Sequence, residues 1–477
     1  MNDRSDSARP SRRTILALAA AGAVTSSMAQ ARPSENRKGQ RPGEYDAIIV
    51  GAGFAGLTAA RELKQFGYRV LILEARDRVG GRAYTADFNG KPNDLGGTWI
   101  HWFQPHVWAE ISRYGMDIVE SPGNFADDVI YLDETGQRHQ TRISALGAEV
   151  YGPIMALFAE AREIMPRPAE PFVDTRWIDA DTLSVADKLA ASALTPEGRI
   201  IAATICAANS GAASKNVSWI DIVRLIALSG YSLELQGDVL SRFKVKGGMR
   251  SLYTALADDC GATIELGSPV TAIETTPDGV RVVGANGKVY SAKAAISTLP
   301  LNTLKDVAFA PPLPEQKRKV SVEGHAGKAS KIHVLVDGER PLFTGWAPGT
   351  GTSPINFILW DGIENGCTHL IAFGSADHPL DVMSKAEIES ALDQFLPNVV
   401  VLDSKAHDWN SDPYSKGAWC ISRPGQISKA LKALQAPHGR VFFASGDWAS
   451  AWRSAIDGAI EQGITTARDL HRLLSSN

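Results

Sequence analysis

A glycine-rich turn near residue 51 constrains the fold of this chain more than any other feature. Ala47-Ile48-Ile49-Val50 is a short apolar run typical of a buried parallel strand, and Gly51-Ala52-Gly53-Phe54-Ala55-Gly56 follows it at once. Apolar residues then recur at helical spacing as far as Phe66, and Val70-Leu71-Ile72-Leu73 is a second apolar run. The order of strand, glycine turn, helix and strand predicts a βαβ unit at the start of the folded chain.

The three glycines fit the pattern G-x-G-x-x-G, which binds a dinucleotide when it joins a strand to a helix. Gly51 allows the tight turn, Gly53 lets the backbone approach a pyrophosphate, and Gly56 lets the helix pack closely on the strand. The helix N-terminus at Phe54-Ala55 offers free N–H groups and the positive end of the helix dipole to the phosphate. Glu74 ends the second strand, where its carboxylate can accept hydrogen bonds from the adenosine ribose.

The residues after Glu74 favour FAD over NAD. Ala75-Arg76 leads into Gly80-Gly81-Arg82, which is similar to the extended fingerprint of FAD-binding oxidoreductases, where it lies near the pyrophosphate. Arg82 can neutralise phosphate charge, and the two glycines let the backbone come close. A turn without a ligand is the alternative interpretation of these residues.

Composition and charge exclude several classes of protein. With 44% hydrophobic and 21% charged residues, the chain is typical of a soluble globular protein that buries a large core. Its formal net charge is -4 and it has no basic face, which argues against a nucleic acid or an anionic membrane as partner. The four cysteines are far apart and form no C-x-x-C pair, so we expect buried free thiols, with one disulfide left open, and no zinc site.

The N-terminus has the features of an export signal. Ser11-Arg12-Arg13-Thr14-Ile15-Leu16 is a twin-arginine sequence, a weakly apolar run follows, and Ala29-Gln30-Ala31 supplies a cleavage pattern. A chance arginine pair on a tail is the alternative. We expect a signal peptide over 1–31, a linker over 32–43 and a periplasmic protein that is exported folded, without stable membrane insertion.

The order of helical and strand-like patterns predicts an α/β fold with two domains interleaved along the chain. After the linker we expect a first FAD-binding part at 44–125, a helical substrate-domain part at 126–240, a second FAD-binding part at 241–305, a strand-rich substrate-domain part at 306–404 and a third FAD-binding part at 405–477.

From Tyr45 to Thr85 the chain resembles the flavin monoamine oxidase family, and the match continues at intervals to the C-terminus. Leu95-Gly96-Gly97-Thr98-Trp99 is similar to a family segment beside the flavin, and Pro269-Val270 to a backbone contact at the adenine end. Gly446-Asp447 resembles the step at which an acid holds the ribityl chain, and Ile456 would present its backbone near the isoalloxazine. The resemblance implies a Rossmann-like FAD-binding domain and a mixed α+β substrate domain. The implied cofactor-binding residues are Gly51, Gly53, Phe54, Ala55, Gly56, Glu74, Ala75, Arg76, Gly80, Gly81, Arg82, Gly96, Gly97, Thr98, Trp99, Val270, Gly446, Asp447 and Ile456.

Within the family, three stretches look most similar to bacterial nicotine and pseudooxynicotine oxidases: residues 100–108, residues 408–415 and Pro166-Arg167-Pro168. This resemblance implies hydride transfer from the α-carbon of a neutral amine to the N5 atom of the flavin. The resulting imine would add water to give a carbonyl compound and a smaller amine. The implied substrate is a secondary amine that bears an aromatic ring.

The family commonly places two aromatic rings beside the substrate nitrogen, and this chain matches only one of them. Trp419 matches the first position, whereas Ala455 stands at the second and leaves room for a bulkier amine. The expected substrate pocket consists of Trp102, Trp419, Trp452 and Ala455, with either Trp452 or Trp448 as the residue that could replace the missing ring.

Two further positions carry expectations about the chemistry. Lys331 matches a family lysine that holds a water near the flavin, and the alternative is a solvated charge at a strand edge. Together with the two ring positions, the expected catalytic positions are Lys331, Trp419 and Ala455. Ala418 stands where some members carry a cysteine bonded to the flavin, which implies non-covalent FAD. His101 and His106 are expected to order their loop.

Two other functions remain open at this stage. One is another flavoenzyme of the same superfold, such as a desaturase or a porphyrinogen oxidase, and the other is a non-catalytic carrier of the GDP-dissociation-inhibitor type. For the amine oxidase, the electron acceptor is molecular oxygen or a soluble cytochrome, and the oligomeric state, a homodimer included, is open.

Overall fold

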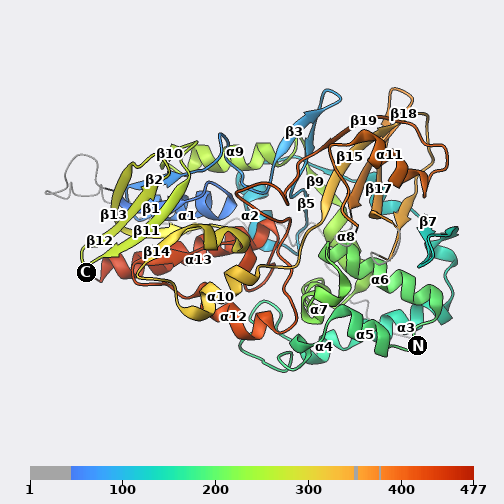
Figure 1. Cartoon of the computed structure of the whole chain (residues 1–477), viewed down its shortest axis with the longest axis horizontal. Coiled ribbons are helices and arrows are strands. Elements are labelled where there is room, and N and C mark those ends of the chain that lie inside the picture. The colour runs from blue at the N-terminus through green and yellow to red at the C-terminus, as the bar shows by residue number, and fades with distance from the viewer. Residues whose placement is uncertain (1–44, 349–352, 375–377, 477) are drawn as a thin grey trace, which may run out of the picture. The chain divides into compact units, whose positions relative to one another are not determined.

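The computed structural model describes residues 45–348, 353–374 and 378–476. The expected signal peptide at 1–31 and the linker at 32–43 lie outside the described residues. Within the described part, the fold consists of two large sheets and a group of helices (Figure 1). Residues of all three line one continuous cavity.

The first sheet contains the predicted βαβ unit. β1 (Tyr45–Val50), α1 (Phe54–Gln65) and β2 (Val70–Leu73) follow one another, and β1 pairs in parallel with β2 on one side and with β13 on the other. The strand order is β10-β2-β1-β13-β12-β11-β14, with β20 paired to the second half of β13. The remaining strands of this sheet are β10 (Thr263–Glu265), β11 (Val270–Thr276), β12 (Gly279–Gly284), β13 (Val289–Ser297), β14 (Ala308–Ala310) and β20 (Val441–Phe443).

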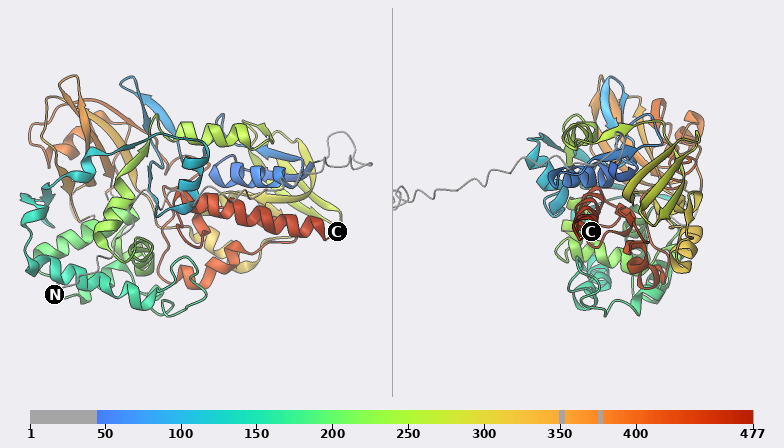
Figure 2. Two further views of the ribbon diagram at one scale, coloured as in Figure 1. Left: turned by 180° about the vertical axis from the view of Figure 1, so that it is seen from behind. Right: turned by 90° about the vertical axis from the view of Figure 1, so that its left-hand side faces the viewer.

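Both faces of this sheet are covered, which explains why its central strands are apolar throughout. On β1, Ala47 and Ile49 pack with α1, α9 (Met249–Asp259) and α13 (Ile456–Ser475), whereas Ile48 and Val50 face the opposite core. That core includes α10 (Glu315–Glu323) and α12 (Gln426–Gln435). Figures 1 and 2 show α1 and α13 side by side from two directions, so the first and last helices of the described chain pack on the same face.

The second sheet lies beyond the cavity and gathers strands from distant parts of the chain. Its order is β19-β15-β18-β17-β16-β7-β8, and α11 (Lys385–Asp393) packs on its outer face. The strands are β7 (Asp128–Leu132), β8 (Arg138–Arg142), β15 (Ser330–Val336), β16 (Thr344–Trp346), β17 (Ile355–Glu364), β18 (Cys367–Gly374) and β19 (Val401–Ala406).

Helices between residues 148 and 241 close another side of the cavity. They are α3 (Ala148–Ala159), α4 (Ala161–Ile164), α5 (Val185–Ala191), α6 (Pro196–Ser210), α7 (Trp219–Leu228) and α8 (Leu233–Ser241). α6 begins just after Thr195, whose hydroxyl accepts the Gly198 N–H at 3.1 Å and caps the helix. Smaller elements complete the fold: β3 (Thr85–Phe88), β4 (Lys91–Asp94), β5 (Trp99–Ile100), α2 (Pro105–Arg113), β6 (Ile118–Glu120) and β9 (Phe243–Val245).

Four strands belong to a different sheet, or have a different structure, from what the expected domain parts implied. β7 and β8 belong to the second sheet, although residues 126–240 were expected to be helical. β14 lies beyond the expected boundary at 305 and still pairs with β11 of the first sheet, and β19 extends past 404 in the second sheet. Short polar strands such as β8 carry too little apolar alternation to be recognised from sequence.

The described residues show the state of the cysteines and the lengths of the apolar helices. All four cysteines are free, with Cys206, Cys260 and Cys420 buried, so the open disulfide does not form. Among the helices of the described part, none is long and apolar enough to cross a bilayer.

A buried ion cluster ties the C-terminal segment to α7. The Asp221 carboxylate is fully buried between the Arg224 and Arg453 guanidiniums, and it also accepts the Ser422 N–H at 2.6 Å. Burial raises the pKa of Asp221, but the two guanidiniums outweigh it and bring the pKa down to about 2. The carboxylate therefore stays ionised and balances charge that water cannot reach.

Replacing this carboxylate should destabilise the protein strongly. Asp221→Ala leaves two buried guanidiniums without their counter-charge, and we expect a loss of about 3–5 kcal/mol in the free energy of unfolding. Because the folded pKa lies below the unfolded value, this contribution is present above about pH 4 and is lost as the pH falls toward the folded value. Urea unfolding measures the change, with Asp469→Ala, from an exposed pair with Arg472, as the control that should change stability little.

Candidate functional site

The glycine turn has the geometry that its sequence predicts. Gly51 has φ +108°, and a Cβ there would lie 2.3 Å from the Thr298 hydroxyl oxygen. A Cβ on Gly56 would lie 2.0 Å from the Gly51 carbonyl oxygen, so the helix packs on the turn without room for one carbon atom. Gly53 precedes α1 without a side-chain cap, which leaves the first N–H groups of the helix for a phosphate.

Glu74 and the Gly80-Gly81 pair surround this turn. The Glu74 carboxylate is 3% exposed and accepts the N–H groups of Ala52 at 2.7 Å and Arg76 at 2.8 Å. The Gly80 N–H donates to the Ala52 carbonyl at 2.9 Å, and a Cβ on Gly81 would lie 3.3 Å from the Gly53 Cα. The bare backbones of the two glycine segments therefore form a cradle that side chains would fill, and its shape suits a pyrophosphate.

Arg82 and Asp447 differ from their expected roles. The Arg82 guanidinium pairs with the fully buried Asp447 carboxylate and donates to the Ala418 carbonyl at 3.0 Å. Asp447 also accepts the Leu301 N–H at 2.8 Å, so its carboxylate faces away from the cavity and does not line it. Asp447 was expected to lie along the cofactor, whereas its carboxylate is taken up by Arg82 and the Leu301 N–H and does not line the cavity. Arg82 does line the cavity, with its charge balanced by Asp447.

One cavity of about 1450 Å³ runs from the glycine turn to the second sheet. This exceeds the roughly 300–1000 Å³ of an ordinary ligand pocket, as a site for a dinucleotide and a second molecule requires. The predicted site residues that line it are Gly51, Gly53, Phe54, Ala55, Glu74, Ala75, Arg76, Gly80, Gly81, Arg82, Gly96, Gly97, Thr98, Trp99, Val270, Lys331, Trp419, Gly446, Trp452, Ala455 and Ile456. Gly56, Asp447 and Trp102 do not line it.

The far end of the cavity has an aromatic wall. The rings of Trp99 and Trp419 both pack against Phe373, with centroids 6.0 and 6.4 Å from it, and Phe357 packs 6.0 Å from the same ring. Phe357 and Phe373 come from β17 and β18 and were not predicted. They are paired with each other across the two strands, and only this pairing shows that both rings belong to one aromatic group. The sequence of each strand alone does not give it.

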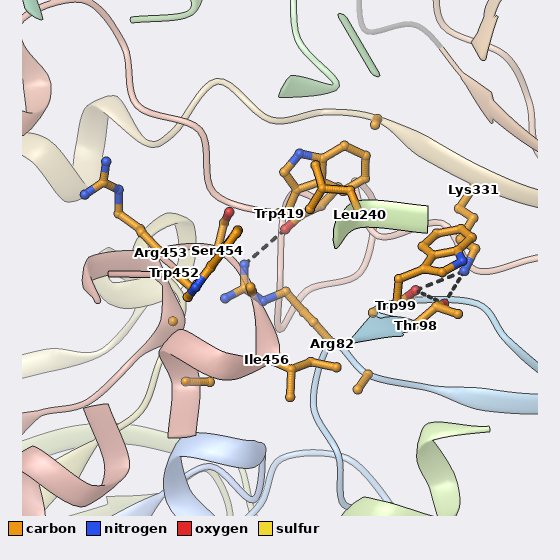
Figure 3. Close-up of a pocket in the computed structure, with 18 of the residues that line it drawn as sticks. Arg82, Thr98, Trp99, Leu240, Lys331, Trp419, Trp452, Arg453, Ser454 and Ile456 are labelled. Atoms are coloured by element: carbon orange, nitrogen blue, oxygen red, sulfur yellow. Dashed lines mark hydrogen bonds between the residues drawn. The ribbon is translucent and has the colours of Figure 1, made fainter. Parts of the chain in front are cut away.

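Trp419 is held in place from behind. Its indole N–H donates to the Asn209 carbonyl at 3.0 Å. Gly211 ends α6 in the left-handed conformation, and a Cβ there would lie 2.8 Å from the indole. Figure 3 shows Trp419 above Arg82, with Ser454 and Trp452 on one side and Lys331 with Trp99 on the other.

The second of the two ring positions holds only the small side chain of Ala455, as the sequence indicated. Ala455 lines the cavity, and the Trp452 ring packs behind it with its indole N–H donating to the Phe103 carbonyl at 2.7 Å. Trp448 is fully buried in the main core and does not line the cavity. Of the two candidate replacements for the missing ring, only Trp452 reaches the cavity wall.

Lys331 is buried, and the alternative of a solvated strand-edge charge is wrong. The ammonium nitrogen donates to the Thr98 hydroxyl and, at 3.2 Å, to the Gly96 carbonyl, and it lies 4.6 Å from the centroid of the Trp99 ring. Burial lowers the pKa of Lys331 to about 7, although the Asp94 carboxylate opposes the shift. The amine can therefore hold or release a proton near neutral pH beside the cavity.

The loop after β5 was assigned partly wrongly. Trp102 is 48% exposed, and its ring packs on His101 and Phe243 at the surface, so it does not belong to the substrate pocket. His101 and His106 order this loop as expected, through Asp238 at 3.2 Å and Asp457 at 3.1 Å. Among the described residues, no group of three or more His, Cys, Asp or Glu side chains could hold a metal.

A dinucleotide cradle that opens into an aromatic chamber defines a nucleotide-cofactor oxidoreductase. The sequence profile described as "Flavin containing amine oxidoreductase" matches residues 54–471, and the chain belongs to that family. FAD is accordingly its cofactor, and the chain is an FAD-dependent amine oxidoreductase. The non-catalytic carrier and the other flavoenzymes considered from sequence are set aside.

The relatives include enzymes that act on nicotine compounds. Pseudooxynicotine dehydrogenase of a Pseudomonas species is 34% identical over 480 residues, which cover 97% of this chain and 96% of that protein. Nicotine dehydrogenase of Pseudomonas putida is 33% identical, with 98% of each chain covered. (S)-6-hydroxynicotine oxidase of Paenarthrobacter nicotinovorans is 32% identical, with 87% of this chain and 97% of that protein covered. The subgroup resemblance seen in the sequence is confirmed.

Solved structures support the fold. Putrescine oxidase bound to putrescine matches with a TM-score of 0.77 at 24% identity, covering 90% of this chain and 99% of that chain. Cyclohexylamine oxidase from Brevibacterium oxydans matches with a TM-score of 0.76 at 21% identity, with the same shares covered.

The burial of Lys331 gives a prediction with a defined sign. Its folded pKa of about 7 lies below the unfolded value of about 10.4, so the unfolded chain binds more protons between these values and stability rises with pH across that window. Lys331→Met removes this cost, so we expect the variant to match or exceed the wild type in stability near pH 6 and the difference to shrink toward pH 10. The rate of amine oxidation should nevertheless fall by about 10²-fold.

Thermal unfolding from about pH 6 to pH 10 and the rate of flavin bleaching by an amine check the two parts separately. Lys328→Met, at the neighbouring and less buried lysine, is the control. A variant that unfolds earlier than wild type at every pH would contradict the assignment of a buried, easily neutralised amine.

Proposed function

We propose that this enzyme oxidises an amine that bears an aromatic ring, of the nicotine or pseudooxynicotine kind, and that a secondary amine is its preferred substrate. The single observation that carries the proposal is Ala455 facing an otherwise aromatic chamber, because the missing ring leaves space for a ring of the substrate. The names of the relatives support the same substrate class.

The chamber favours the neutral form of an amine. Its walls are mostly apolar, and the charges nearest to them are balanced: Arg82 by Asp447, and Arg453 by Asp221. Desolvation in such a chamber penalises an ammonium ion, and the neutral amine is the form that can lose hydride. Lys331, with its lowered pKa, is placed at the wall to hold a proton or a water there.

FAD supplies the hydride acceptor when it is bound. In the reaction proposed here, hydride leaves the α-carbon of the amine, and the imine then adds water to give a carbonyl compound and a smaller amine. Trp419, anchored on Asn209, orients the substrate by stacking, while Phe373, which packs on it, and Trp99 exclude water from the same wall. Molecular oxygen and a soluble cytochrome remain the two candidate acceptors.

We infer that the cofactor is not covalently attached. Ala418 offers no thiol, and the Cys420 thiol is buried against the Asp447 carbonyl at 3.6 Å, outside the large cavity.

Restoring the second ring should change the preferred substrate. Ala455→Tyr fills the space opposite Trp419, so we expect kcat/KM for a bulky aromatic secondary amine to fall relative to that for a small primary amine by roughly 10-fold or more. Anaerobic flavin reduction with a panel of amines measures this without involving the acceptor. Ala455→Ser keeps the space and is the control; an unchanged ranking of amines in Ala455→Tyr would refute the proposal.

Mixing the reduced enzyme with oxygen or with a cytochrome separates the two candidate electron acceptors.

We also propose that the enzyme is exported to the periplasm by the twin-arginine route, on the basis of Arg12-Arg13 and the Ala29-Gln30-Ala31 pattern. Replacing both arginines of the pair by lysine should move the yellow, folded protein from the periplasmic fraction to the cytoplasm. The control is Arg4→Lys with Arg9→Lys, which keeps the charge and leaves the pair intact. Periplasmic protein in the pair variant would contradict this route.

A further inference from the structure

A row of buried ionisable groups extends from Lys331 away from the cavity. Lys331 and His333 lie on one face of β15, and His369 of β18 continues the row toward Asp361 and Glu364 on β17. His333 and His369 are 2% and 3% exposed, and Phe88 of the β3–β4 hairpin covers them with ring centroids 6.4 and 5.6 Å away. No step of the proposed oxidation uses these two imidazoles.

The row holds a turn that lines the cavity. Three successive carbonyls of the turn formed by residues 94–98 each accept from a side chain of another segment. His333 bonds to the Asp94 carbonyl at 3.0 Å, the Trp409 indole to the Leu95 carbonyl at 2.9 Å and Lys331 to the Gly96 carbonyl at 3.2 Å. Gly96 and Thr98 on the same turn line the cavity, so His333 acts on the cavity wall from behind.

The surroundings of the two imidazoles favour one more proton than a neutral pair carries. Since a carbonyl only accepts, His333 must carry a proton on Nε2 to bond Asp94, which leaves its Nδ1 as an acceptor. His369 must then donate from Nε2 to this Nδ1, across 3.1 Å. The last nitrogen, His369 Nδ1, faces the Asp361 and Glu364 carboxylates at 3.5 and 3.8 Å, which also only accept. The two hydrogen bonds take the two protons that a pair of neutral imidazoles carries, and the carboxylates at 3.5 and 3.8 Å attract a third proton to His369 Nδ1 by their charge.

We propose that His333 and His369 are positioning residues that take up one shared proton on mild acidification and thereby tighten the 94–98 turn against FAD. With the third proton, His369 donates to His333 and to the carboxylates at once, and the bond from His333 to Asp94 is fixed. Without it, a proton drawn to His369 Nδ1 by the carboxylates switches both imidazoles to the opposite tautomer and leaves His333 Nε2 bare opposite the Asp94 carbonyl.

The charged groups around His333 and His369 set the pH range in which this proton is taken up. Lys331 lies on the same strand, Lys244 of β9 pairs with Asp361 at 2.6 Å, and Lys91 of β4 pairs with Glu364 at 2.9 Å. The Asp94 carboxylate is engaged by the Thr85 hydroxyl and the Met249 N–H. Burial lowers the pKa of both histidines, with Lys331 adding to the effect on His333 and the carboxylates opposing it on His369. Uptake therefore falls on the acid side of the usual histidine range, and FAD binding should become tighter as the pH falls through it.

The test compares the pH dependence of FAD binding in the wild type and in His369→Gln. The glutamine amide can donate to His333 at every pH but does not titrate. We expect the dissociation constant of FAD to fall by about fivefold in the wild type, relative to the variant, between pH 7.5 and pH 5.5, the fold-change of one net hydrogen bond. His471→Gln, at a histidine that bonds Tyr68 instead, should follow the wild type. Parallel pH profiles in the wild type and His369→Gln would overturn the proposal.

A second measurement applies even where the glutamine variant folds poorly or FAD cannot be removed. Nitrogen-15 spectra of histidine in the wild-type holoenzyme report the protonation of each ring nitrogen. The proposal requires two imidazoles that gain a single proton together on acidification, and Asp361→Asn should shift that event to lower pH. Two imidazoles that stay neutral to pH 5, or that titrate independently, would overturn it.

Discussion

The close approach of α1 to β1 is the constraint on which the rest of this structure depends. No carbon atom fits between Gly56 and the Gly51 carbonyl, so the helix N-terminus is held directly over the turn. That position brings Glu74 within reach of the Ala52 N–H and lets the Gly80-Gly81 backbone cross the turn. A larger residue at Gly56 would move the helix and α13, which packs on it, and with α13 the Ala455 segment of the chamber.

The sequence allowed the cofactor half of the site to be predicted, because the contacts there are local. Glu74, the glycines and the strand–helix–strand order lie within about forty residues, and their geometry follows from backbone sterics. Lys331 and Trp419 were found through resemblance to the family, and the structure places both at the cavity wall. Their roles in the chemistry remain predictions.

The remaining part of the site depends on pairings between distant segments. Phe373 reaches the chamber only because β18 pairs with β15 and β17 in one register, and a shift of one residue would turn it to the other face. Asp447 was placed along the cofactor, but its carboxylate is taken by Arg82 and the Leu301 N–H, two partners separated from it by more than a hundred residues. Trp102 was expected in the pocket, whereas a turn after β5 directs it to the surface.

Charge is distributed so that the chamber can stay apolar while its supports are ionic. Arg453, two positions before Ala455, pairs with the buried Asp221 carboxylate. The Glu461 carboxylate accepts the N–H groups of Ser450 and Ala451 at 2.9 and 3.1 Å. Ser454, between Arg453 and Ala455, has φ +75°. This backbone conformation costs energy in a residue with a side chain and persists only when its surroundings impose it. Because the segment is fixed by groups behind it, the side chain at 455 contributes little to holding the backbone. The size of that one residue can therefore vary without disturbing the cradle that binds FAD.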